Sequence, residues 1–186
     1  MKNIILFASG GGSNARRIME YFAGRQGYRV RALLTNNPNA GAIAIADSHN
    51  VPSVIFNRDE LNDGTVLSEV KKYSPDIIVL AGFLWKFPTD IIKEYPHKVI
   101  NIHPALLPNY GGKGMYGMNV HRAVHENRDK ESGITVHYVN EHYDEGNVIF
   151  QKAIAIEECL SPEDVALKVL SLEHKHFPVV IEQLLK

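Results

Sequence analysis

Asn101 and His103 stand out because the two polar residues flank Ile102 at the end of an apolar run. Successive side chains of a strand point to opposite faces, so Asn101 and His103 share one face while Ile102 enters the core. Pro104 then holds His103 in an extended conformation. An Asn amide can stabilise an oxyanion and a His can move a proton, so the pair is a candidate for catalysis. The spacing alone is equally compatible with a structural histidine that is bonded to the backbone.

A second candidate site is the glycine-rich sequence 10–14, Gly-Gly-Gly-Ser-Asn, which follows the first apolar run. If a helix begins here, free backbone N–H groups, the helix dipole and a hydroxyl converge where a phosphate could bind. The sequence lacks the Lys-Ser/Thr ending of a nucleoside-triphosphate loop, and Arg16 and Arg17 occupy the third-glycine region of a dinucleotide fingerprint. ATP and NAD are therefore not expected as ligands. The alternative is a tight strand-to-helix turn that binds nothing.

Two carboxylates are ambiguous from the sequence alone. Asp144 lies in the polar stretch 140–146, which is typical of a solvated turn. Glu173 lies near the C-terminal end of a predicted helix and is by default a surface carboxylate. The nine histidines show no metal-ligand spacing and no Cys/His cluster is present, so no metal is expected.

Alternating strands and helices must position these residues. Short apolar runs predict strands that are covered on both faces, with helices between them. The strands are expected at 4–8, 30–34, 53–56, 76–80 and 99–102. A first helix is expected from Ser13, whose hydroxyl would cap it, and further helices are expected at 40–49, 66–73 and 90–94. This pattern indicates a doubly wound α/β sheet, in which ligands bind at the carboxyl ends of the strands.

The C-terminal part of the chain departs from this alternation. The apolar runs 134–139 and 148–156 predict two strands with no helix between them, and therefore an antiparallel pair. A last helix is expected over 162–185, capped by Ser161. The predicted fold is thus a mostly parallel sheet of about seven strands with helices on both faces and an antiparallel C-terminal strand pair. The sequence 109–118 contains four glycines and is expected to be a mobile loop.

Composition excludes several classes of protein. A chain of 186 residues with 45% hydrophobic content suits one domain spanning 1–186. A formal net charge of −1 is too balanced for a protein that binds nucleic acid through many phosphate contacts. The apolar run 4–8 is far shorter than the roughly 20 residues of a membrane span. With the single cysteine, Cys159, and no export signal, we expect a cytoplasmic protein without a membrane partner.

Taken together, the motifs resemble the phosphoribosylglycinamide formyltransferase family over nearly the whole chain. The resemblance rests on the sequences 9–14, 81–84, 101–104, 106–108, 133–137 and 173–174 and on Asp144. An Asn, a His and an Asp in this order are typical of folate-dependent formyl transferases. The glycine-Ser-Asn loop after the first strand favours the enzyme that acts on glycinamide ribonucleotide.

The resemblance implies direct transfer of a formyl group from 10-formyltetrahydrofolate, the co-substrate, to the amine of glycinamide ribonucleotide in de novo purine biosynthesis. It assigns Asn101, His103 and Asp144 to catalysis. It also implies that Gly12, Ser13 and Asn14 hold the substrate phosphate and that Glu173 contacts the same substrate. The folate would be contacted by Arg58 and by two sequences, namely Phe83, Leu84, Trp85, Lys86 and Phe87, and Asn140, Glu141, His142 and Tyr143.

A carboxylate beside an imidazole favours the charged ring, so Asp144 is expected to raise the pKa of His103 and to orient it. The alternatives are formyltetrahydrofolate deformylase, a formyl transferase acting on methionyl-tRNA or an amino sugar, and a non-catalytic nucleotide-binding module. The alternative enzymes usually carry a further domain, for which this length is too short, and a binding module has no need of the three catalytic candidates. The oligomeric state is expected to be a monomer or a homodimer.

Overall fold

All seven strands of the protein belong to one sheet, as seen in a computed structural model that describes residues 1–186. The strands are β1 (Lys2–Phe7), β2 (Tyr28–Thr35), β3 (Ser53–Ile55), β4 (Ile77–Leu80), β5 (Val99–His103), β6 (Glu131–Tyr138) and β7 (Val148–Ala155), in the order β3-β2-β1-β4-β5-β6-β7. The first five strands run parallel. β6 is antiparallel both to β7, as predicted, and to β5. The predicted fold class is confirmed.

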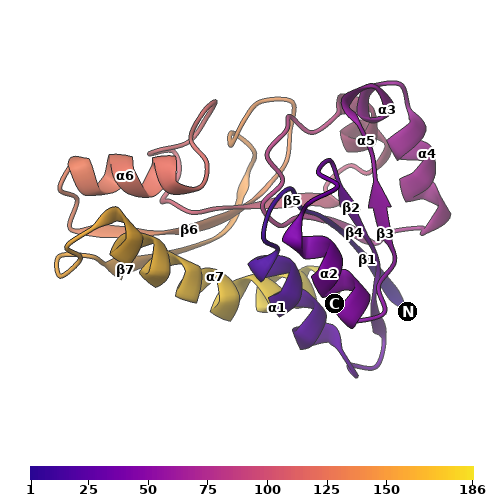
Figure 1. Ribbon diagram of the computed structural model, residues 1–186, viewed down its shortest axis with the longest axis horizontal. Helices are drawn as coiled ribbons and strands as arrows, with labels where there is room; N and C mark the ends of the chain where they lie inside the picture. The colour runs from indigo at the N-terminus through magenta and orange to yellow at the C-terminus, as the bar shows by residue number, and fades with distance from the viewer.

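The helices cover both faces of the sheet (Figure 1). They are α1 (Ser13–Phe22), α2 (Gly41–Ser48), α3 (Arg58–Asn62), α4 (Thr65–Lys72), α5 (Thr89–Glu94), α6 (Met118–Glu126) and α7 (Pro162–Leu185). In β1, Ile4 and Leu6 belong to the core cluster that also contains residues of α1, α2, α6 and α7, whereas Ile5 and Phe7 belong to the cluster that contains residues of α3, α4 and α5. The alternation of side chains along a strand therefore explains why β1 is apolar at every one of these positions.

Two helices are absent from the sequence-based prediction. α3 has five residues and buries only Leu61, which is too short for a helical period to be recognised. α6 follows the glycine-rich sequence 109–117 and buries Val120, His121 and Val124. Because a histidine lies in the middle of this apolar face, the helical pattern is weak.

The predicted cap of the first helix was wrong. Gly12, and not Ser13, is the N-cap of α1, and no side chain caps this end. Gly12 has φ +78°, a left-handed conformation that glycine adopts easily. A Cβ atom added here would lie 2.7 Å from the Cα atom of Ala42, so the close packing of α2 also requires glycine. At α7 the predicted cap is confirmed, since Ser161 Oγ accepts a hydrogen bond of 3.2 Å from the Asp164 N–H.

The β6–β7 pair extends beyond the parallel strands. Residues 135–138 of β6 pair with β5, whereas residues 131–134 pair only with β7. α7 packs on this extension (Figure 1). α6 in turn contacts α7. The carboxyl end of β5 therefore lies where the parallel body meets the antiparallel extension. None of the helices is both long and apolar enough to cross a lipid bilayer.

Candidate active site

A cavity of about 300 Å³ lies at the carboxyl ends of β4 and β5. Most of the predicted site residues line it, namely Asn14, Phe83, Leu84, Trp85, Lys86, Phe87, Asn101, His103, Asn140, Glu141, His142, Tyr143, Asp144 and Glu173. Gly12, Ser13 and Arg58 do not line it. The structure thus brings together residues that are far apart in the sequence, at the place where a doubly wound sheet binds its ligands.

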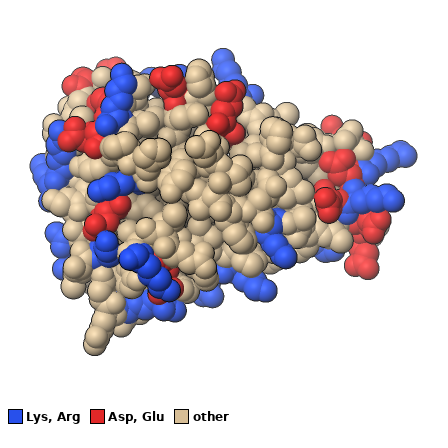
Figure 2. Space-filling view, turned by 180° about the vertical axis from the view of Figure 1, so that it is seen from behind, with Lys and Arg blue, Asp and Glu red and all other residues tan.

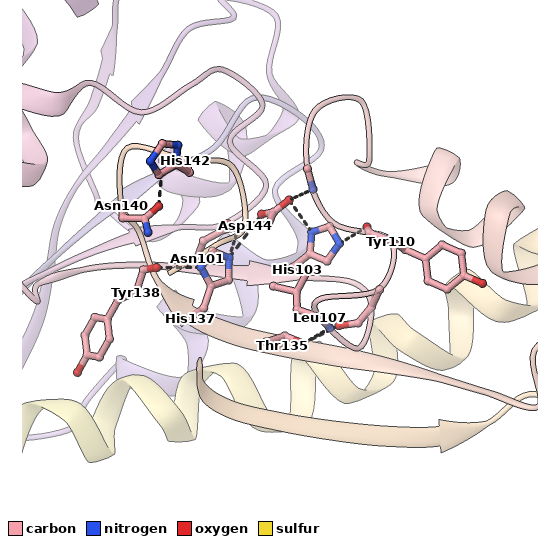
Figure 3. A network of polar contacts seen from close by, with 12 residues as sticks. Asn101, His103, Leu107, Tyr110, Thr135, His137, Tyr138, Asn140, His142 and Asp144 are labelled. Atoms are coloured by element: carbon pink, nitrogen blue, oxygen red, sulfur yellow. Dashed lines mark hydrogen bonds and ion pairs between the residues drawn. The ribbon is translucent and has the colours of Figure 1, made fainter. Parts of the chain in front are cut away.

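The carboxylate of Asp144 lies between two buried imidazole rings (Figure 3). Its Oδ2 atom is 3.5 Å from Nδ1 of His103, and its Oδ1 atom is 3.5 Å from Nε2 of His137. The outer nitrogen of each ring faces a backbone carbonyl, at 2.7 Å for His103 Nε2 and Tyr110 O and at 2.9 Å for His137 Nδ1 and Tyr138 O. Since a carbonyl oxygen only accepts hydrogen bonds, both outer nitrogens carry a proton.

The glycine-rich sequence between β5 and α6 contacts both the Asp144 carboxylate and the ring of His103. The Gly112 N–H donates a hydrogen bond of 3.0 Å to Asp144 Oδ2, two residues after the carbonyl of Tyr110 that faces His103. Tyr110 is itself anchored, because its hydroxyl donates a 2.6 Å hydrogen bond to Asp129. A segment that the sequence predicts to be mobile therefore contacts two of the three catalytic candidates, His103 and Asp144. Its mobility stays a prediction.

Burial decides the charge of His103. Burial lowers the pKa of His103, and the charge of Asp144 and the Tyr110 carbonyl, which both act to raise it, do not compensate. Asp144 acts in the predicted direction, but the expected net increase in the His103 pKa was wrong because His103 is only 3% exposed. The sequence gives no measure of that burial.

Asp144 remains a carboxylate at neutral pH. Burial acts to raise its pKa, but its contacts with His137 and His103 and the Gly112 N–H outweigh burial and lower the pKa. At neutral pH the pair therefore consists of a carboxylate beside a largely neutral imidazole, which can accept a proton.

Asn14 and Glu173 form the second polar group of the cavity. The Nδ2 atom of Asn14, in the first turn of α1, donates a 2.7 Å hydrogen bond to Glu173 Oε2. Burial raises the pKa of Glu173 to about 7, against the smaller opposing effect of the Asn14 hydrogen bond. The default interpretation of Glu173 as a surface carboxylate near the end of its helix was wrong. The residue is 8% exposed and lies in the middle of α7, where that helix packs on α1.

The remaining lining residues form a largely apolar wall. Phe83 and Phe87 are buried and pack edge-on against Phe7, with ring centroids 5.5 and 5.0 Å apart. The Arg58 guanidinium lies 4.5 Å from the centre of the Trp85 ring, so the arginine reaches the cavity wall through this stacking contact. On the opposite side, the turn 140–143 is closed by a 2.9 Å hydrogen bond from the His142 N–H to Asn140 Oδ1.

Sequence reasoning missed His137 and His121 as site residues. His137 lies directly opposite Asn101 in the register of β5 and β6, with its Nε2 atom 3.2 Å from Asn101 Nδ2. His121 also lines the cavity, and its Nδ1 atom is buried without a hydrogen-bond partner. A strand register between β5 and β6 would have identified His137, but the spacing of residues does not provide one. The structure contains no group of three His, Cys, Asp or Glu side chains arranged to hold a metal ion.

Comparison with known proteins identifies the family of this chain. A family model described as formyl transferase matches residues 2–181. Phosphoribosylglycinamide formyltransferase of Bacillus subtilis is 35% identical, and the match covers 100% of this chain and 95% of that protein. The chloroplastic phosphoribosylglycinamide formyltransferase of Arabidopsis thaliana is 38% identical over 97% of this chain. The match spans 64% of the length of that plant protein.

Solved structures give the same result. Glycinamide ribonucleotide transformylase 1 from Geobacillus kaustophilus superposes with a TM-score of 0.89 and 32% sequence identity, over 100% of both chains. Phosphoribosylglycinamide formyltransferase from Anaplasma phagocytophilum gives a TM-score of 0.88 and 28% identity over 96% of this chain and 84% of that one. The resemblance inferred from the motifs is confirmed. The chain belongs to the formyl transferase family.

Proposed function

We propose that this protein transfers a formyl group from 10-formyltetrahydrofolate to the amine of glycinamide ribonucleotide, in de novo purine biosynthesis. One observation carries the proposal: Asn101, His103 and Asp144 lie in the same cavity as Asn14 and Glu173, so a catalytic group directly adjoins a candidate phosphate-binding helix end. The names of the relatives in Bacillus subtilis and Arabidopsis thaliana support the same activity.

The acceptor phosphate binds at the N-terminus of α1. Backbone N–H groups of Gly12 and Ser13 are free there because no side chain caps the helix, and the helix dipole favours an anion. Ser13 is exposed and adds a hydroxyl donor. Asn14 and Glu173 connect this end to the cavity, where Glu173 contacts the same substrate.

The donor binds along the apolar wall. The pterin ring lies between the 83–87 and 140–143 segments, mainly through backbone groups, while the aromatic side chains Phe83 and Phe87 hold their backbone in place from the core. Arg58, held over Trp85, is a cation available to the donor's carboxylates beside this wall.

Chemistry then requires one donor for the oxygen and one path for a proton. The amine nitrogen bonds to the formyl carbon, and Asn101 donates a hydrogen bond to the oxygen as negative charge grows there. His103 accepts the amine proton at Nδ1, because its Nε2 atom already donates to Tyr110, and Asp144 stabilises the imidazolium. The bond from the formyl carbon to the folate nitrogen breaks, and that nitrogen takes the proton. Alignment of the two bound substrates contributes further.

The proposed partners are small molecules. The protein is proposed to act in the cytoplasm, as a monomer or a homodimer. Figure 2 shows basic and acidic side chains interspersed around a broad uncharged area, and on this face no extended basic patch favours nucleic acid. The single cysteine suits a reducing compartment.

One assay tests the function. The purified protein is incubated with 10-formyltetrahydrofolate, with and without glycinamide ribonucleotide, while the folate absorbance is followed. Loss of the formyl donor only when the acceptor is present is the expected result. Loss without the acceptor would indicate a deformylase, and binding without any loss would indicate a non-catalytic module. Either outcome would overturn the proposal.

A further inference from the structure

His137 contacts two of the three catalytic candidates. It faces Asn101 across the β5–β6 ladder, with Nε2 3.2 Å from Asn101 Nδ2, and the same nitrogen is 3.5 Å from Asp144 Oδ1. The residue is 2% exposed, so its side chain makes these contacts inside the protein and away from bulk water. Figure 3 shows the ring of His137 between these two residues and the Tyr138 carbonyl.

The hydrogen bonds of the ring determine its tautomer. Nδ1 lies 2.9 Å from the Tyr138 carbonyl oxygen, which only accepts hydrogen bonds, so Nδ1 carries the proton. In the neutral ring, Nε2 then has a lone pair and acts as an acceptor. The Asn101 amide nitrogen at 3.2 Å is a donor within hydrogen-bonding distance, whereas the 3.5 Å separation from Asp144 exceeds the usual range for an N–H···O bond.

This tautomer selects one orientation of the Asn101 amide. If the amide were reversed, its carbonyl oxygen would face the lone pair of His137 and the two would repel each other. The amide nitrogen has two N–H groups, and the one not bonded to His137 remains available for the reacting oxygen. We propose that His137 is a positioning residue that holds the Asn101 amide so that an N–H group, and not the carbonyl, addresses the formyl oxygen. This inference rests on the proposed function.

Gly146 packs directly against the Tyr138 carbonyl that accepts the hydrogen bond from His137. A Cβ atom added at Gly146 would lie 1.6 Å from the Tyr138 carbonyl oxygen and 3.5 Å from His137 Nδ1. The turn that carries Asp144 therefore folds directly over the carbonyl that accepts from His137. Only glycine permits this approach. The packing of the turn, the tautomer of His137 and the orientation of the Asn101 amide therefore all involve the same Tyr138 carbonyl.

The first test is spectroscopic and needs no substrate. In ¹⁵N-histidine NMR spectra of the ligand-free protein at neutral pH, His137 is expected to show a protonated Nδ1 and an unprotonated, hydrogen-bonded Nε2. In Asn101→Ala, the Nε2 resonance should move toward the position of a free acceptor. A ring protonated at Nε2, or an Nε2 resonance that does not respond to Asn101→Ala, would overturn the proposal whether or not the proposed reaction is correct.

The second test separates positioning from a structural role. His137→Leu removes the acceptor and should lower kcat by about ten- to a hundredfold, with both KM values within about twofold of the wild type. His137→Gln, whose side-chain oxygen can replace Nε2 as an acceptor, should recover part of that loss. His125→Leu, at a histidine near the C-terminal end of α6 and outside the cavity, is the matched control and should leave kcat unchanged.

A double-mutant cycle shows whether His137 acts through Asn101. If it does, Asn101→Ala combined with His137→Leu should be no slower than Asn101→Ala alone. Additive losses, or an equal loss in His137→Gln and His137→Leu, would overturn the proposal. If His137→Leu fails to fold, the comparison of His137→Gln in the two backgrounds and the NMR test still decide the question.

Discussion

The backbone carbonyl of Tyr110 lies 2.7 Å from Nε2 of His103, so this nitrogen donates and cannot serve as the proton acceptor of the site. Nδ1, which faces Asp144 at 3.5 Å, is therefore the nitrogen available for proton transfer. A main-chain contact thus determines which nitrogen of His103 can accept a proton, and the anchoring of the Tyr110 hydroxyl by Asp129 keeps that carbonyl in place.

His103→Ala is expected to lower turnover by about a hundredfold or more, as for the loss of general acid–base catalysis. The affinities for both substrates and the fold should change little, because the ring lines the cavity and donates to one carbonyl only. Steady-state kinetics combined with calorimetric binding measures this. Near-wild-type turnover would remove His103 from the mechanism.

Asp144→Asn should lower turnover and also move the acid limb of the pH–rate profile. His103 must be neutral to accept a proton, so activity falls as the pH drops through its pKa. The charge of Asp144 raises this pKa, although burial keeps the net value lowered, and so its removal should shift the acid limb to lower pH. Profiles of kcat/KM for the two proteins give the comparison. An acid limb that stays in place would show that the two groups are not coupled.

Glu173→Gln is expected to change the pH dependence of stability. The wild-type carboxyl has a pKa of about 7 when folded, above its ordinary value of 4.5, because of burial. Its contribution is fully present below pH 4.5 and is lost as the pH rises to about 7, where the buried group must ionise. The variant should therefore gain up to about 3 kcal/mol in unfolding free energy relative to the wild type between pH 4.5 and 8.

Denaturant unfolding of both proteins at the two pH values measures this difference. Gln can still accept the hydrogen bond from Asn14, so the packing of α1 on α7 should be retained. A stability difference that does not change with pH would mean that the Glu173 carboxyl has the same pKa in the folded and unfolded protein, and that burial does not raise it.

The phosphate proposal is best tested at Gly11. An added Cβ atom meets nothing within 4 Å at Gly11, whereas at Gly12 it would collide with Ala42 and require a left-handed backbone. Gly11→Ala should therefore fold normally. Because the added methyl group would lie beside the proposed phosphate position, the variant should weaken binding of glycinamide ribonucleotide alone. Gly12→Val should weaken the same ligand but also lose stability. Calorimetric titration of each ligand decides the matter, and a loss of folate affinity with intact ribonucleotide affinity would show that the two pockets are reversed.

The sequence predicted the parts of the site that depend on local pattern. Alternation along β5 gave both Asn101 and His103 as cavity residues, and the apolar runs gave a doubly wound sheet with its ligands at the strand ends. These features follow from the geometry of one strand and from burial on both faces of the sheet. The roles of the two residues remain predictions.

Contacts between residues far apart in the sequence could not be predicted from local sequence patterns. His137 is a site residue only because β6 pairs with β5 in a register that places it opposite Asn101. Glu173 meets Asn14 across 159 positions of the sequence, and nothing near Glu173 distinguishes it from a surface carboxylate. For His103, the sign of the pKa shift depends on burial, which is a property of the whole fold.

The two sides of the cavity are built from different parts of the chain. The proposed acceptor side depends on α1 and α7 through Asn14 and Glu173, whereas the proposed donor side depends on the segments after β4 and β6. β5, which supplies Asn101 and His103, lies between β4 and β6 in the sheet. If the proposed function is correct, substitutions confined to two helix faces would alter the choice of acceptor while the one-carbon chemistry is retained, so that evolution could change one half of the cavity at a time.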